Sequence, residues 1–205
     1  MRAMTWTGLL AVLALLGGTE TGLAARLDDP DWPCIQRRVP ELAIGQMWPG
    51  PMPAEDAAAD PEIKTLARRL APRRVSVDDI PAAVEAPLQQ VAPEARPEWL
   101  AGLFAAILRQ INAERDDLIA GIGRFAARQR SMAEAIDVLE SDLAKLEEAP
   151  EGERNMDRIE ELQDELAWET RIFKERAHSL TYVCETPVLL EKRAFAIGRG
   201  LAALK

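Results

Sequence analysis

A long proline-free segment constrains the fold of this chain more than any other feature. Residues 98–149 contain no proline, and their apolar side chains recur at alternating steps of three and four. The series runs from Phe104 to Leu146, with Arg115 and Gln129 as polar members of the same series. A heptad pattern maintained over about six repeats predicts one long helix with a narrow apolar seam.

The chain then turns and returns with the same spacing. Pro150 followed by Glu151-Gly152-Glu153 predicts the turn, and the seam of the returning helix is expected to include Arg176 and Val183. Two heptad helices joined by a short connection pack antiparallel, so residues 98–186 are predicted to form a helical hairpin. The expected register places Leu143 opposite Ile159, Ile136 opposite Leu166, Gln129 opposite Phe173 and Leu118 opposite Cys184.

Shorter helices are expected to surround one end of the hairpin. Asp60 before Pro61 is a typical helix start, and a second helix is expected to begin after Ser76 and end near residue 92. Pro187 is expected to kink or restart the returning helix, leaving a C-terminal helix over residues 188–204. Because residues 99–127 are apolar on more than one face, we expect them to form the centre of a helical-bundle base.

Proline also divides the chain. Twelve of the fourteen prolines lie between Pro30 and Pro97, so residues 26–59 are predicted to form an extended arm. The arm carries Trp32 and Trp48, whose large apolar surfaces are expected to pack on the helices. The predicted fold is therefore all-α: a helical domain over residues 60–205, with a bundle base, a long antiparallel coiled-coil hairpin and an extended N-terminal arm.

The first 25 residues resemble a secretory signal. Arg2 precedes the apolar run 7–18, and the stretch Gly22-Leu23-Ala24-Ala25 offers small residues for a cleavage site. The run of about a dozen residues is shorter than the roughly 20 needed to span a bilayer, and retention as an anchor is the alternative. We expect residues 1–25 to be a cleaved signal peptide and the protein to be periplasmic, without stable membrane insertion.

Two cysteines, Cys34 and Cys184, are present in the chain. In an oxidising compartment the simplest arrangement is a bond between them. Redox-active thiols usually occur as Cys-x-x-Cys, whereas these two are widely separated in the sequence. We therefore expect a structural disulfide that staples the arm to the returning helix.

The negative charge is concentrated in one part of the chain. Residues 134–171, here called the acidic tip, hold fourteen acidic and four basic residues, a net charge of −10 against −9 for the whole chain. A solvated coiled-coil surface is one explanation, and a partner-binding surface is the other. The net charge argues against nucleic acid as a partner. The candidate partner-binding residues are Glu140, Glu147, Glu148, Glu153, Asp157 and Glu161.

No pattern of catalytic or metal-binding residues is recognised. His178 is the only histidine, so a histidine-based relay cannot be built, and no Asp-x-Asp-x-Asp-Gly calcium loop occurs. Phosphate-loop, dinucleotide-binding and hydrolase motifs are also absent. We expect no enzyme activity, no cofactor and no resident metal ion.

The sequence therefore predicts a non-enzymatic exported interaction protein: an adaptor, an accessory subunit or a holdase. Such a protein would present an acidic coiled-coil hairpin to a protein partner of unknown identity, in an unknown oligomeric state. The alternative is a periplasmic metal-handling or redox accessory protein. It would use Cys34, Cys184, Met47 and Met52 with His178, since soft sulfur ligands suit Cu(I).

Overall fold

The computed structural model describes residues 32–204, so the expected signal peptide lies outside the described residues. This part of the chain contains helices and no strand, which confirms the all-α prediction. None of its helices is apolar over a long enough stretch to cross a membrane. The elements are α1 (Ile44–Met47), α2 (Pro61–Leu70), α3 (Ile80–Gln89), α4 (Arg96–Glu147) and α5 (Met156–Ala202), with 3-10 turns at Ala57–Ala59, Val77–Asp79 and Pro93–Ala95.

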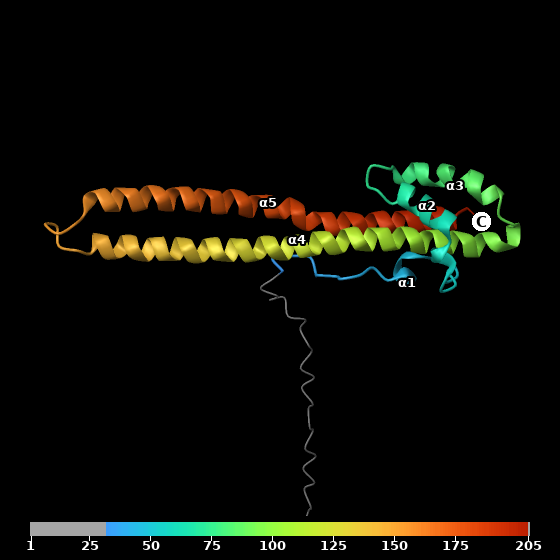
Figure 1. The fold of residues 1–205 in the computed structure, drawn as a ribbon, viewed down its shortest axis with the longest axis horizontal. Coiled ribbons are helices and arrows are strands. Elements are labelled where there is room, and N and C mark those ends of the chain that lie inside the picture. The colour runs from blue at the N-terminus through green and yellow to red at the C-terminus, as the bar shows by residue number, and fades with distance from the viewer. Residues whose placement is uncertain (1–31, 205) are drawn as a thin grey trace, which may run out of the picture.

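Helices α4 and α5 form the antiparallel hairpin, and their far half projects from the rest of the molecule (Figure 1). Helix α4 contains 52 residues and ends before Pro150. In the turn, the amide of Glu153 donates to the carbonyl of Pro150 at 2.8 Å. The side chain of Asn155 then caps α5 by accepting from the amide of Arg158 at 3.1 Å.

The predicted register holds at three contacts across the hairpin, from its middle to the base. The Gln129 amide donates to the carbonyl of Phe173 at 3.3 Å, and the Arg115 side chain reaches the carbonyl of Pro187 at 3.5 Å. Nearer the base, a Cβ on Gly198 would lie 3.1 Å from the ring of Phe104. The two helices therefore keep one alignment from the middle of the hairpin to the base.

Of the kink or restart expected at Pro187, the restart is wrong, because α5 is continuous through the proline. Figure 1 shows α5 bending between its distal and basal halves without breaking. Proline removes one amide donor and bends a helix. Here both halves of α5 pack on α4 in the same register. This packing keeps the chain helical on either side of the proline.

The expected seam of α5 also needs correction near the proline. Arg176 is exposed and Val183 is 39% exposed, whereas the next residue, Cys184, is only 6% exposed. A straight helix drifts by about 20° per heptad relative to a strict 3.5-residue repeat. We attribute the exposure of Arg176 and Val183 to this drift, whereas the burial of Cys184 comes from the arm, to which it is bonded.

The apolar core lies in the base, where α2 and α3 pack against the basal halves of α4 and α5 (Figure 1). The buried members of this cluster on α4 end at Ile111. The range 99–127 expected for the centre of the base therefore extended too far along α4. Ile119 and Ile122 are buried but belong to the hairpin and not to the cluster. Its members on the long helices are Leu100, Ala101, Leu103, Phe104, Ala106, Ile107, Leu108, Ile111, Leu190, Ala194, Ile197 and Leu201.

Arg193 of α5 joins the short helices to the hairpin. Its guanidinium donates to four carbonyls at and beyond the end of α2, at distances of 2.8–3.2 Å. These are groups that the end of a helix leaves without intrahelical partners. Burial lowers the pKa of Arg193, an effect that nearby Glu114 opposes. The accepting carbonyls belong to Leu70, Ala71, Pro72 and Val75.

Candidate partner-binding surface

The six candidate residues of the acidic tip all lie on the surface. They occupy the end of α4, the turn and the start of α5. Beneath them the seam is narrow: Ile159 and Leu162 are buried, while their α4 partners Leu143 and Leu139 are half-buried. The tip is therefore held by one line of apolar contacts and exposes carboxylates around it. These exposed residues are Glu140, Glu147, Glu148, Glu153, Asp157 and Glu161.

Two of the six carboxylates have polar partners within the tip. Glu147 accepts a hydrogen bond from the side chain of Gln163 at 3.1 Å, which links the two helices. Glu161 forms an ion pair with Arg158, one turn earlier on α5, at 2.5 Å. The hydrogen bond and the charge of Glu161 raise the pKa of the Arg158 guanidinium. Exposed pairs of this kind contribute little to stability, so the carboxylates remain available to a partner.

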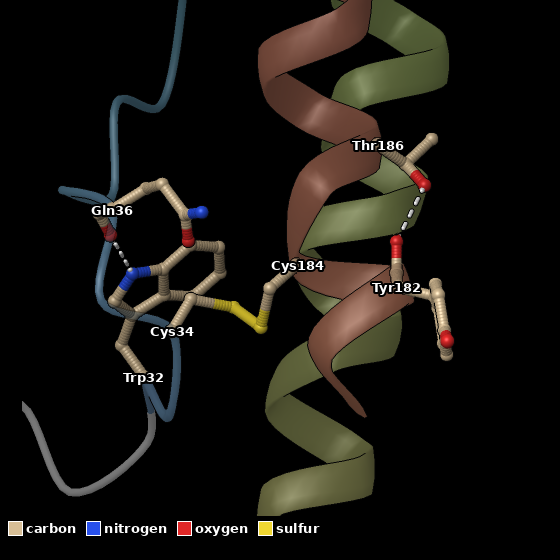
Figure 2. Close-up of a disulfide and its surroundings, with 6 residues drawn as sticks. All are labelled: Trp32, Cys34, Gln36, Tyr182, Cys184 and Thr186. Carbon is tan, nitrogen blue, oxygen red and sulfur yellow. Dashed lines mark hydrogen bonds between the residues drawn. A yellow bond between two sulfur atoms is a disulfide. The ribbon is translucent and has the colours of Figure 1, made fainter. Parts of the chain in front are cut away.

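Beside the hairpin, the arm is joined to α5 by the expected disulfide. Cys34 and Cys184 are bonded, with their Cα atoms 5.5 Å apart. Figure 2 shows Cys184 projecting from α5 toward the arm, with Tyr182 and Thr186 on the other side of the helix. The indole of Trp32 lies next to Cys34 and donates to the carbonyl of Gln36 at 2.6 Å.

Polar side chains of α4 hold the next part of the arm. Asn112 accepts from the amide of Leu42 at 3.0 Å and donates to its carbonyl at 3.1 Å, so both main-chain groups of Leu42 are paired. Arg115 donates two hydrogen bonds to the carbonyl of Val39, at 3.1 and 3.3 Å. Arg115 therefore connects the arm to α4 and, through Pro187, to α5.

Arg115 is only 2% exposed, which is unusual for a charged residue. Burial lowers the pKa of its guanidinium, and the charges of Glu191 and Asp116 oppose that shift. Sequence reasoning identified Arg115 as a polar member of the seam but not as the anchor of the arm. An arginine at an apolar position of a heptad series was the signal that pointed to a buried partner.

The arm ends in the base, where Trp48 packs on the helices as expected. Trp48 is buried and stacks on Phe104 of α4, with 5.3 Å between ring centroids. Its indole donates to the carbonyl of Pro51 at 2.7 Å. The short helix α1 and the turn Ala57–Ala59 were not predicted within the arm, but the remainder of the described arm is irregular or extended. The arm is therefore a packed part of the fold.

The residues of the alternative metal-handling reading are dispersed. Met47 is buried in the core, whereas Met52 is 60% exposed, and both cysteines are engaged in the disulfide. His178 is exposed on α5, where its ring lies edge-on to Tyr182 with centroids 6.0 Å apart. Within residues 32–204 no group of three histidine, cysteine or acidic side chains is arranged to hold a metal ion.

No protein-family model matches this chain, and no curated protein or solved structure is significantly similar to it.

Proposed function

We propose that this chain is an exported, non-enzymatic interaction protein that presents its acidic tip to a basic surface on a protein partner. It would act as an adaptor or accessory subunit. A holdase that grips unfolded chains between hairpins is a variant of the same proposal, and that variant requires oligomers.

The separation of the core from the charge is the observation that carries this proposal. The apolar core ends at Ile111 on α4 and resumes at Leu190 on α5. The hairpin continues from Ile111 to Glu147, about 54 Å at the usual rise per residue, and over this stretch of α4 only the half-buried Leu118 packs against the core. A helical hairpin of that length is not needed to bury the core, and it positions six exposed carboxylates far from the base.

Export is the second part of the proposal. The disulfide between Cys34 and Cys184 supports it, because such bonds persist in oxidising compartments. The pattern of residues 1–25 supports it independently, and we therefore propose the periplasm as the working compartment.

Two variants test the role of the tip. In the first, residues 137–164 are excised and the helices are joined by a short turn, which removes the projection but leaves the core cluster intact. In the second, the six candidate carboxylates are replaced by their amides in the full-length chain. Each variant and the parent are used to capture partners from a periplasmic extract. We expect the parent to retain a partner, both variants to lose it, and the parent complex to weaken as salt rises.

The second variant guards against a failure of the first to fold, since its exposed substitutions leave every core contact in place. Helix content by circular dichroism serves as the folding control for both. If the amide variant still captures the same partner, the proposal is wrong and the binding surface lies on the arm or the base.

A further inference from the structure

A shallow groove runs along one side of the hairpin where the acidic tip ends. Its volume is about 430 Å³, and the half-buried side chain of Leu166 and the small side chain of Ala167 form part of its lining. Acidic and basic side chains also line it. The lining residues are Glu140, Gln163, Leu166, Ala167, Thr170, Arg171 and Lys174.

The charges in the groove are placed symmetrically about its middle. Extending the register of Gln129 and Phe173 by eleven residues along both helices places Glu140 at the level of Leu162 on α5. Lys174 lies twelve residues further along α5, about 18 Å away at the usual rise per residue. Ala167 falls within one residue of the midpoint. Glu140 and Lys174 are therefore too far apart to pair within one molecule, but their positions are related by a half-turn about Ala167.

The charged residues around the groove are also placed so that a half-turn about Ala167 brings opposite charges together. Next to the acidic tip lies a basic collar, defined as residues 124–133 and 172–180, with five basic residues and one acidic residue. A half-turn about Ala167 brings the collar of one molecule opposite the tip of another. The basic members are Arg124, Arg128, Arg130, Lys174 and Arg176.

The hairpin also has room for a second copy at this level. Figure 1 shows that α4 and α5 run alone along their distal half, while α1, α2 and α3 lie on the basal side. A second hairpin lying antiparallel about Ala167 would extend to the level of Cys184, where the arm begins to cover α5. The uncovered stretch therefore matches the length that a second hairpin would occupy.

We propose that the groove docks a second copy of this chain. The two hairpins lie antiparallel about a two-fold axis near Ala167, and Lys174 of each copy pairs with Glu140 of the other. The result is a four-helix bundle built from two hairpins, an arrangement that covers faces which a two-helix hairpin leaves open. This inference concerns self-association, and it does not depend on the proposed binding of a different protein by the tip.

The test is a charge exchange measured by sedimentation velocity on the disulfide-bonded chain. In both Glu140→Lys and Lys174→Glu, the two symmetric contacts of the dimer become repulsive. We expect the dissociation constant of each homodimer to rise by roughly tenfold or more. An equimolar mixture of the two variants restores both contacts in a heterodimer, so dimers should reappear on mixing. The double variant should dimerise for the same reason.

Two exposed residues of the base provide matched controls with the same changes of charge. Glu85→Lys on α3 and Lys192→Glu on α5 should dimerise like the parent. The proposal is overturned if the parent is monomeric at about 100 µM, a concentration at which a dimer with a dissociation constant of about 1 µM is almost fully formed. It is also overturned if the single variants dimerise normally, or if mixing them recovers no dimer. Partner capture by Lys174→Glu then shows whether the tip acts without dimerisation, because Lys174 is not among the six candidate carboxylates.

Discussion

At the scale of single residues, the arm is held by side chains that satisfy its main chain. Arg109, Asn112 and Arg115 lie three positions apart on α4, and each donates to a carbonyl of the segment between Val39 and Ala58. An irregular segment has no ladder of main-chain hydrogen bonds, so its buried polar groups must find other partners. The three side chains of α4 supply those partners for Ala58, Leu42 and Val39.

Arg115→Met tests the anchor in this series. The substitution keeps much of the apolar volume but leaves the carbonyl of Val39 without its two hydrogen bonds. We expect a loss of about 2–3 kcal/mol in the free energy of unfolding, since hydrogen bonds to charged groups are among the stronger ones. Urea unfolding followed by tryptophan fluorescence measures this change. Arg124→Met, at an exposed position of the same helix, is the control and should stay within about 0.5 kcal/mol of the parent.

Residue-level chemistry could be predicted only in part. The disulfide was predictable because the chain holds two cysteines. The partner of Arg115 was not, because a main-chain carbonyl has no side-chain signature in the sequence. The groove between Glu140 and Lys174 was also missed, since it depends on which faces of two helices lie side by side. A heptad seam determines how the helices face each other and says little about their outer sides.

At the scale of elements, the hairpin was predictable because its seam determines both the partner and the register. The pairing of Gln129 with Phe173 follows from the heptad spacing together with the position of the turn. The course of α5 near Pro187 was not predictable in the same way. Local chemistry favours a break at that proline, while packing against α4 on both sides favours continuity, and the strength of that packing is a tertiary property.

Replacing both cysteines by alanine tests how strongly the position of the arm depends on the disulfide. In the chain-entropy model, the bond across 150 residues contributes at most about 4–5 kcal/mol, because it restricts the unfolded chain. We expect a lower midpoint of thermal unfolding with nearly unchanged helix content, measured by circular dichroism. Protease cleavage between Cys34 and Val39 should also accelerate. Unchanged cleavage of this segment would mean that Arg115 and Asn112 hold the arm without the disulfide.

At the scale of the whole molecule, stability and charge lie at opposite ends. The base contains the core cluster, the buried tryptophan Trp48 and the capping contacts of Arg193. The distal hairpin contains one narrow seam and a net charge of −10 over residues 134–171. Repulsion among these carboxylates opposes close packing of other acidic surfaces, but it favours a basic surface of a partner or the basic collar of a second copy.

This division predicts a gradient of amide hydrogen exchange along the hairpin. Local opening is governed by the number of buried contacts that it breaks, so amides near Leu103 should be the slowest and those near Leu143 faster by roughly tenfold or more. In the parent protein, protection of the distal segment should rise with protein concentration, because a second copy covers its groove. In Lys174→Glu, protection of the distal segment should not rise with concentration. The amides near Leu103 should exchange at the same rate in both proteins. Exchange measured by mass spectrometry at two concentrations separates the two effects.

Equal protection of base and tip at low concentration would show that the tip is stabilised by more than its own seam. If the same gradient is found at both concentrations, the difference in stability between base and tip is supported but the proposed dimer is contradicted.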